Sequence, residues 1–409
     1  MQSSKTFFLF SDELESTFVY NEVIQLSQRF AKVIVVGLKT TQQQLPANVE
    51  FVVLSQNDFN PKAIFKQHFA LVFKLLLKEF LLRSWNFSYL KNYREVVYYL
   101  LHSIYYSEKI SQLIDERKIN KNEIVCLSFW FNTWAVALGI LKQQHKINSF
   151  YARTHGIDLF EFRIEKTKRI PFRKFQLQMV DKVFSVSRNG ENYLKEKYPS
   201  CAHKVFTNYL GTEDKGKAEF SNNTIFTIIS CARVRDIKRI FLIPEILKHL
   251  NYPIKWIHLG QEDFYLKDPS YKIYLKNKED LKNYPHIQTQ FPGYLSNQQI
   301  FDFYKNNSIN LFVSVSETEG LPVSIMEAIS FGIPVLATDV GGCREIVTEQ
   351  TGILIPKDFD VKQVATQITE FKESEKNTIE FRNQVRNFWK NNFEATINYD
   401  FFCKQINER

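Results

Sequence analysis

Short apolar segments alternate with longer amphipathic segments along almost the whole chain. The apolar segments are rich in Val, Ile and Phe, as in Thr6–Phe10, Val33–Val36, Phe51–Leu54, Ile124–Phe129, Val183–Val186, Ile225–Cys231, Ile254–Leu259, Ile309–Val313, Pro334–Thr338 and Gly352–Ile355. Continuous apolar runs, as opposed to strict alternation, are typical of parallel strands that helices cover on both faces. The pattern therefore predicts an α/β protein with doubly wound parallel sheets.

The strand-and-helix pattern starts again in the middle of the chain. Residues 211–218 and 221–223 are rich in Gly, Ser, Asn and charged side chains, and a new series of apolar runs begins after them. A chain of 409 residues, at about 150 residues per domain, has room for two such domains. We predict Rossmann-like domains over residues 1–212 and 213–385, and then a closing amphipathic helix in residues 386–409 that carries Trp389, Phe393, Tyr399 and Phe402.

The most informative segment is residues 309–334. An apolar strand is followed by a polar loop that contains Glu319, and Pro322 then fits the first turn of a helix, where an N–H is not needed. Glu327 lies further along this helix, and Gly332 ends it. Ligands of open α/β sheets bind at the carboxyl ends of the strands, so the pattern places both carboxylates at a predicted binding site.

The loop and the first helical turn offer two kinds of polar group. The N–H groups of Gly320, Leu321 and Val323 would point at an anion, because the start of a helix has unpaired N–H groups and a positive partial charge. The carboxylates of Glu319 and Glu327 can accept hydrogen bonds from hydroxyl groups. A phosphate beside a polyol is the chemistry of a nucleotide sugar.

These residues and their neighbours resemble a known signature. The order Glu319-x7-Glu327, followed by a Gly-x-Pro strand start and by Gly341-Gly342, is similar to that of the retaining glycosyltransferases of family 4, which have the GT-B fold. The resemblance implies two Rossmann-like domains that face a cleft and a C-terminal helix that crosses back to the first domain. It implies that Glu319 holds sugar hydroxyls and acts in catalysis, that Glu327 holds the ribose diol, and that neither a metal nor a cofactor is required.

The resemblance also assigns the other residues of the donor site. Arg233 and Lys238 correspond to an Arg and a Lys, five residues apart, that grip the diphosphate, and Arg235 and Arg239 compete for these roles by their position in the sequence. Positive charge is needed there because negative charge grows on the leaving diphosphate. The remaining donor-binding residues would be Gly320, Leu321, Pro322, Val323, Gly260, Gly293 and Tyr294.

A second resemblance lies in the first half of the chain. Arg153, His155 and Asp158 belong to the motif Arg-Thr-His-Gly-Ile-Asp, which resembles a branch of the family that builds bacterial surface polysaccharides. This implies that His155 reaches into the cleft and acts in catalysis, with Arg153 and Asp158 on the acceptor side. The Gly-Gly loop that many relatives carry after the first strand is absent, because Phe10-Ser-Asp12-Glu stands in its place.

One region departs from the alternating pattern. Residues 61–100 contain seven Lys or Arg but only two Glu, with ten aromatic side chains among them. A second basic cluster comprises Arg163, Lys166, Lys168, Arg169, Arg173 and Lys174. One interpretation is a core helix whose lysine stems reach the solvent. A second is a surface that contacts an anionic membrane through residues 61–100 and 163–174, because basic and aromatic side chains suit the headgroup layer. A third is a surface that contacts nucleic acid.

Composition narrows the class of partner. The chain has 53 Lys and Arg against 44 Asp and Glu, a formal charge of +9, which favours phosphates, acidic lipids or nucleic acid. Five separated cysteines without CxxC spacing argue against a zinc site and a disulfide framework. We find neither a signal peptide nor an apolar span of about 20 residues, and expect a cytoplasmic protein, peripheral at most on the inner face of the cytoplasmic membrane.

Together these features predict a retaining, metal-independent glycosyltransferase of bacterial surface polysaccharide biosynthesis. Its partners would be a nucleotide-sugar donor and a saccharide or lipid-linked saccharide acceptor, with no nucleic acid. Two alternatives stay open. One is a non-transferring nucleotide-sugar enzyme, such as an epimerase or a phosphorylase, which would lack the Glu-x7-Glu loop or use a cofactor lysine. The other is a basic module that binds nucleic acid or membrane, which would respond to DNA but not to nucleotide.

Overall fold

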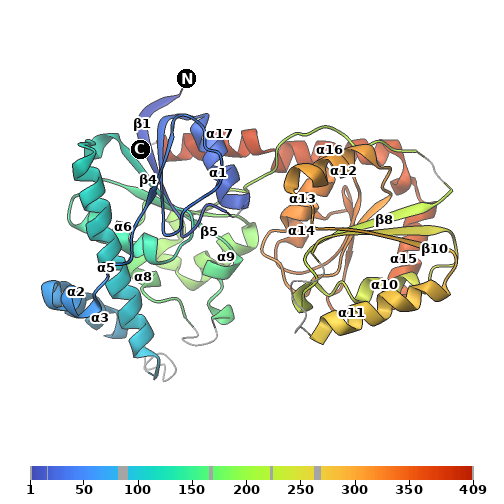
Figure 1. The fold of residues 1–409 in the computed structure, drawn as a ribbon, viewed down its shortest axis with the longest axis horizontal. Helices are drawn as coiled ribbons and strands as arrows, with labels where there is room; N and C mark the ends of the chain where they lie inside the picture. The colour runs from blue at the N-terminus through green and yellow to red at the C-terminus, as the bar shows by residue number, and fades with distance from the viewer. Residues whose placement is uncertain are drawn as a thin grey trace. The chain divides into compact units, whose positions relative to one another are not determined.

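The computed structural model describes residues 2–15, 17–81, 91–164, 169–221, 224–261 and 269–407. The chain forms two compact units (Figure 1). Unit 1 consists of Met1–Asn208 together with Tyr399–Arg409, and unit 2 of Tyr209–Asn398. Each unit has its own parallel sheet and its own hydrophobic core, as the restarted pattern in the sequence predicts.

The sheet of unit 1 has the strand order β3-β2-β1-β4-β5-β6-β7, and all neighbouring strands are parallel. Its strands are β1 (Ser3–Phe10), β2 (Phe30–Gly37), β3 (Val49–Val53), β4 (Ile124–Ser128), β5 (Phe150–Thr154), β6 (Lys182–Ser185) and β7 (Val205–Thr207). The chain first builds outward from β1 to β3 and then returns to place β4 beside β1. The order of the strands therefore reverses between β1 and β4, which is where a doubly wound sheet opens a crevice for ligands.

Helices cover this sheet, and two additional helices pack against one long helix among them. The helices are α1 (Thr17–Ser27), α2 (Pro61–Gln67), α3 (Phe69–Leu81), α5 (Tyr93–Glu116), α6 (Thr133–Gln143), α7 (Gly156–Leu159), α8 (Arg173–Met179) and α9 (Arg188–Lys197). α5 packs against α6, and α2 and α3 pack against α5 (Figure 1). Buried residues of α5 recur at helical spacing, as at Val96, Leu100, Ile104 and Ser107, so one face of this long helix joins the core.

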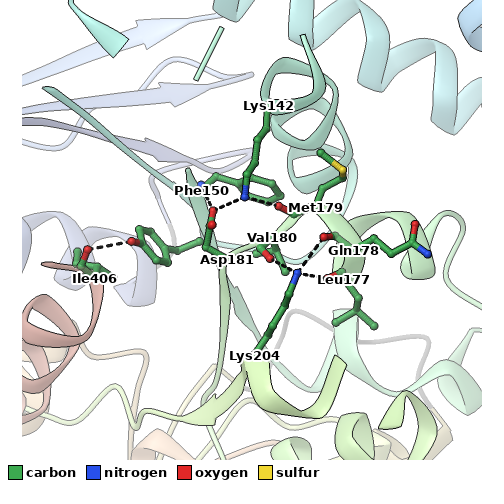
Figure 2. A network of polar contacts seen from close by, with 10 residues as sticks. Lys142, Phe150, Leu177, Gln178, Met179, Val180, Asp181, Lys204 and Ile406 are labelled. Carbon is green, nitrogen blue, oxygen red and sulfur yellow. Dashed lines mark hydrogen bonds and ion pairs between the residues drawn. The ribbon is translucent and has the colours of Figure 1, made fainter. Parts of the chain in front are cut away.

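A polar network fixes α8 and the neighbouring strands of unit 1 (Figure 2). Lys204 Nζ donates to the carbonyl oxygens of Leu177, Gln178 and Val180, at 3.2, 2.9 and 2.9 Å, and so caps the C-terminal end of α8. Lys142 of α6 donates to the Asp181 carboxylate at 2.8 Å. These contacts attach α6 and α8 to the sheet at β5 and β6.

Unit 2 repeats the architecture, with the strand order β10-β9-β8-β11-β12-β13. Its strands are β8 (Phe226–Cys231), β9 (Ile254–Leu259), β10 (Ile287–Gly293), β11 (Leu311–Ser314), β12 (Val335–Thr338) and β13 (Gly352–Ile355). Its helices are α10 (Leu242–Leu247), α11 (Pro269–Asp280), α12 (Asn297–Asn306), α13 (Val323–Ser330), α14 (Cys343–Ile346), α15 (Val361–Glu373) and α16 (Ile379–Phe393). Here the strand order reverses between β8 and β11.

The last part of the chain divides between the two units. α16 stays in unit 2, where Trp389 is buried and its Nε1 donates to Thr212 Oγ1 at 2.8 Å. α17 (Ala395–Asn407) follows, and from Tyr399 onward its residues belong to unit 1. Tyr399 donates to Glu22 at 2.6 Å. Our expectation that the return begins at residue 386 is therefore corrected: it begins about a dozen residues later, because Trp389 and Phe393 complete the core of unit 2.

Candidate functional site

The two loops at the strand reversal of unit 2 meet through a charge pair. Lys238 ends the short helical turn η4 (Asp236–Lys238) after β8, and Glu319 lies in the loop after β11. Lys238 Nζ lies 2.6 Å from Glu319 Oε1. The backbone N–H of Glu317 also donates to the Ile237 carbonyl at 2.8 Å. The strand reversal, where ligands are expected, therefore brings together Lys238 and Glu319, both predicted from the sequence.

Arg239 stabilises the loop that contains Glu319 through hydrogen bonds to backbone carbonyls. Its Nε donates to the Val315 carbonyl at 2.7 Å, and its Nη2 donates to the Lys357 carbonyl at 2.9 Å. Burial of the guanidinium lowers the pKa of Arg239. The sequence left Arg239 as a competitor of Lys238 for the diphosphate, but its guanidinium is used to bind backbone carbonyls. Arg233 lies in the same loop as Lys238 and is exposed to solvent.

Two glycines allow the Glu319 loop to pack against the turn after β12. Gly341 has a φ of +55°, and a Cβ there would lie 2.0 Å from the Glu319 carbonyl oxygen. A Cβ on Gly342 would lie 2.5 Å from the Gly320 carbonyl oxygen, to which the Gly342 N–H donates at 2.7 Å. Both positions therefore require glycine, because the two backbones approach closely. This contact fixes the position of the loop that contains Glu319.

The helix that follows the loop begins one residue later than predicted. Pro322 is the residue that precedes α13, with an extended backbone, and Val323 is the first helical residue. Our placement of Pro322 in the first turn is corrected, since its ψ of 106° is extended and not helical. The N–H groups at the start of an α-helix have no carbonyl partner within the helix, so they suit an anion here.

Glu327 lies within α13 and is almost fully buried. Its exposed fraction is 7%, and Asn297 Nδ2 donates to its Oε1 at 2.7 Å. Desolvation raises the pKa of Glu327 to about 7, and the hydrogen bond from Asn297 opposes this shift. Sequence analysis did not find Asn297, which comes from the start of α12. Its position directly after Ser296, which caps the helix, does not identify a partner.

The residues predicted to lie around the nucleotide base occupy the ends of β9 and β10. The Gly260 N–H donates to the Gly293 carbonyl at 2.9 Å, and a Cβ on Gly260 would lie 1.9 Å from the Ala232 carbonyl oxygen. Tyr294 is 70% exposed. His258, just before Gly260, is fully buried and pairs with Ser230 at 2.8 Å, so its ring is part of the core.

The strand reversal of unit 1 contains a cavity of about 550 Å³. Its lining residues come mainly from the segments that follow β1, β2, β4 and β5 and are mostly apolar: Asp12, Glu13, Lys39, Tyr99, Trp130, Phe131, Asn132, Ile157, Asp158, Ile164, Ile170 and Pro171. Asp12 accepts a hydrogen bond from Trp134 Nε1 at 2.8 Å, and burial raises the pKa of its carboxyl group. Asp12 was noted in the sequence only as the replacement for a glycine loop, and Trp130 was not singled out.

His155 lies at the end of β5, beside this cavity. Its ring centroid is 4.4 Å from that of Trp130 and 4.7 Å from that of Phe129. Within the described residues neither ring nitrogen has a hydrogen-bond partner, and burial lowers the pKa of His155 to about 3. The imidazole is therefore neutral and packed between aromatic rings. A catalytic role for His155 stays a prediction.

Two residues predicted on the acceptor side have structural roles. Arg153 has no exposed surface, and it donates to Glu22 at 2.9 Å and to Asn208 Oδ1 at 2.7 Å. It is corrected to a core residue, because a buried guanidinium paired in this way has no surface left for an acceptor. The Asp158 carboxylate accepts from the N–H groups of Phe131 and His155, both at 2.5 Å. Asp158 borders the cavity, but its carboxylate primarily holds the loops after β4 and β5 together.

The second basic cluster is also corrected in part. Arg173 is fully buried, with its guanidinium 4.0 Å from the centre of the Phe131 ring, and it donates to the Asp158 carbonyl. Arg173 is therefore a core residue and not part of a membrane surface. Lys166 and Lys168 lie outside the described residues, and so do four basic or aromatic residues of the segment 61–100, namely Arg83, Trp85, Phe87 and Tyr89. In the described ranges, no three His, Cys, Asp or Glu side chains are grouped so that they could hold a metal ion.

Comparisons with known sequences agree with the features of unit 2. The family described as glycosyl transferases group 1 matches residues 212–390. The O-antigen biosynthesis glycosyltransferase WbnH of Escherichia coli is 40% identical over 62 residues, which are 15% of this chain and 18% of that protein. The lipopolysaccharide core biosynthesis mannosyltransferase LpsB of Rhizobium meliloti is 37% identical over 75 residues, which are 18% of this chain and 20% of that protein. The chain thus matches about a fifth of the length of these curated relatives.

Solved structures resemble the whole chain. Anabaena Alr3699/HepE, determined in complex with UDP, has a TM-score of 0.69 at 14% identity, with 99% of this chain and 100% of that chain covered. A glycosyltransferase from Rickettsia africae has a TM-score of 0.70 at 14% identity, with 99% and 98% covered. The predicted fold class is confirmed. Residues 212–390 match the group 1 glycosyl transferases, and the chain as a whole has the GT-B fold.

Proposed function

We propose that the protein transfers a sugar from a nucleoside-diphosphate sugar to a saccharide acceptor, with retention of the anomeric configuration, in the assembly of a bacterial surface polysaccharide. The observation that carries the proposal is the Lys238–Glu319 pair at the strand reversal of unit 2, at the start of α13. The names of the matched relatives, which concern O-antigen and lipopolysaccharide core, support the same class of product.

The chemistry follows from an exchange of partners at this pair. A bound diphosphate would replace Glu319 as the partner of Lys238, and the sugar hydroxyls would donate to the released Glu319 carboxylate. When the glycosidic bond breaks, the diphosphate gains negative charge, which Lys238 and Arg233 would stabilise together with the N–H groups at the start of α13. In this proposal the chain's own cations balance the leaving group, and neither a metal ion nor a cofactor is required.

The role of Glu327 in this proposal is to recognise the ribose. Its carboxylate would accept hydrogen bonds from the two ribose hydroxyls. These hydrogen bonds would replace the water that burial has removed from the carboxylate. Gly260, Gly293 and Tyr294 would line the base, mostly through their backbone atoms. The acceptor, a saccharide or a lipid-linked saccharide, would be received by unit 1, where the cavity beside Asp12 lies at the other strand reversal.

The first test is a thermal-shift measurement of the purified protein with UDP, GDP, ADP and CMP, with and without a divalent metal. We expect one nucleoside diphosphate to raise the unfolding temperature to the same extent in both conditions. The matching radiolabelled nucleotide sugars are then incubated with candidate saccharides, and the anomeric configuration of the product is read by NMR. Absence of a shift with every nucleotide would overturn the proposal, and an inverted product would overturn retention.

A further inference from the structure

A row of apolar side chains lies exposed along α2 and α3. Phe65, Phe69, Phe73, Leu77 and Leu81 follow one another at intervals of four residues, and their exposed fractions are 39, 57, 58, 46 and 74%. The ring centroids of Phe65 and Phe69 are 5.7 Å apart, and those of Phe69 and Phe73 are 6.1 Å apart. These five residues, here called the apolar row, form one continuous strip on the surface of unit 1.

The opposite face of the two helices attaches them to unit 1. Ile64, Val72 and Leu75 are buried in its core. At the junction of the helices, His68 Nε2 lies 2.7 Å from Glu108 of α5. Near the end of α3, the buried Glu79 carboxylate accepts a hydrogen bond from the Phe172 N–H at 2.9 Å. The inner face therefore holds the helices in place, and the apolar row is not needed for their packing.

The charges beside the apolar row have one sign. Lys62, Lys66, Lys74 and Lys78 are all exposed on the same two helices. Glu79 is the one acidic residue between residues 61 and 81, and its side chain points into the core with 3% of its surface exposed. Lys91 and the first turns of α5 add exposed basic and aromatic side chains, namely those of Lys91, Tyr93, Arg94 and Tyr98, together with one exposed acidic residue, Glu95. Exposed apolar side chains among basic ones favour a partner that is apolar inside and anionic at its surface.

A phospholipid bilayer with anionic headgroups has this composition. A helix that lies in the plane of the interface buries its apolar face among the acyl chains, and long lysine side chains extend to the phosphates. Nucleic acid fits less well, because Leu77 and Leu81 offer no aromatic face on which a base could stack. No helix of the described residues is both long and apolar enough to cross a membrane.

We propose that α2 and α3 dock unit 1 onto an anionic lipid bilayer, with the apolar row inserted at the headgroup boundary and the four lysines on the lipid phosphates. Of the three interpretations left open by the sequence, the structure favours the membrane surface for this segment, because the row is exposed and not part of the core. The inference rests on unit 1 alone and is independent of the proposed sugar transfer.

The test is flotation of the full chain with vesicles of phosphatidylcholine alone and of phosphatidylcholine with about a third phosphatidylglycerol. We expect the protein to float with the anionic vesicles and not with the neutral ones, and the bound fraction to fall as salt is raised. Phe69→Ser combined with Phe73→Ser, and separately Lys74→Glu combined with Lys78→Glu, should each weaken binding about tenfold or more. Both changes lie on the exposed face, so folding should be retained.

α11 of unit 2 supplies the matched control. It also exposes apolar and basic side chains, and Ile273→Ser combined with Leu275→Ser should leave flotation unchanged. The proposal is overturned if the wild-type protein does not float with anionic vesicles, or if the Phe69 and Phe73 variant floats as well as the wild type. It is also overturned if that variant instead abolishes self-association, measured by sedimentation, or binding to a DNA oligonucleotide. The nucleotide thermal shift, which tests the proposed function, is measured on the same samples and should not change.

Discussion

Lys238 Nζ lies 2.6 Å from Glu319 Oε1, although 81 positions separate the two residues in the sequence. The side chains are 28% and 11% exposed, so the pair is partly shielded from water but open on one side. In the absence of a ligand each group satisfies the other. In the proposed function, a diphosphate that binds Lys238 would displace Glu319, and this would make the carboxylate available to the sugar when the donor arrives.

The exchange predicts opposite effects of two substitutions on binding. Glu319→Gln removes the competing charge, so affinity for the nucleoside diphosphate should stay at or rise above the wild-type level, while transfer falls about 100-fold because the sugar is no longer held. Lys238→Ala should weaken both binding and transfer by at least about tenfold. Calorimetric titration and initial rates of transfer measure the two effects.

A matched control for these variants is the exposed ion pair of Lys282 and Glu279, also 2.6 Å apart. Lys282→Ala should change neither affinity nor rate, since a pair that is 74% and 68% exposed contributes little. Equal diphosphate affinity of Lys238→Ala and the wild type would contradict the partner exchange.

Glu327 predicts a pH dependence of nucleotide binding. The raised pKa, about 7 against an ordinary value of 4.5, means that a substantial fraction of the free protein carries a protonated Glu327 near neutrality. The ribose hydroxyls donate to the ionised form, so nucleoside-diphosphate affinity should rise with pH through about 7, with a proton released on binding. Titrations in buffers of different ionisation enthalpy count that proton, and Glu327→Gln should abolish its release.

The same group should also make folding stability depend on pH. The pKa of Glu327 is raised in the folded state. The contribution of this group to the free energy of unfolding is therefore fully present below about pH 4.5 and is lost as the pH rises through about 7. Glu327→Gln should therefore stabilise the protein at about pH 8 by roughly 3 kcal/mol and leave it unchanged at about pH 4.5. Thermal unfolding at the two pH values gives the comparison, and a variant that is destabilised at the higher value would rule out the buried, proton-binding state.

Gly341→Ala tests the packing of the Glu319 loop. A Cβ would lie 2.0 Å from the Glu319 carbonyl oxygen at a φ of +55°, so the loop must move, and we expect this to disturb the Lys238–Glu319 pair. We expect nucleotide binding to fall about tenfold or more and stability by about 1–3 kcal/mol. Gly216→Ala is the control, because its φ is also positive but its nearest neighbour is 4.0 Å away. Identical binding by both variants would show that the loop position does not depend on Gly341.

The buried Arg153–Glu22 pair should matter for the stability of unit 1. Tyr399 donates to the second oxygen of Glu22 at 2.6 Å, and the Arg153 guanidinium lies 4.5 Å from the centre of the Phe402 ring. Arg153→Met leaves a buried carboxylate without its cation and should cost about 3–5 kcal/mol, whereas Tyr399→Phe should cost about 1 kcal/mol. Thermal unfolding measures both. If Arg153 instead bound the acceptor, its substitution would raise the acceptor KM without changing the unfolding temperature.

Much of unit 2 could be predicted from its sequence, because its strands and the segment around Glu319 are determined by residues that lie close together in the sequence. The apolar runs predict its strands, and the segment from Glu319 to Gly332 contains its own loop, helix and helix end within a few turns of chain. Local spacing determines which residues follow a strand, and the carboxyl edge of a parallel sheet is where such residues collect. The site could thus be assigned before its geometry was known.

Pairings between distant segments depended on the tertiary structure. Arg153 and Glu22, 131 positions apart, meet only because α1 packs where β5 ends in the sheet. Asn297 reaches Glu327 only because α12 begins beside α13. The exposure of side chains also depended on the tertiary structure. Phe69 and Phe73 are residue types that usually lie in the core, but here they lie at the surface. Sequence spacing specifies which residues share a face of an element. What that face contacts is decided by the order of the strands and the packing of the helices.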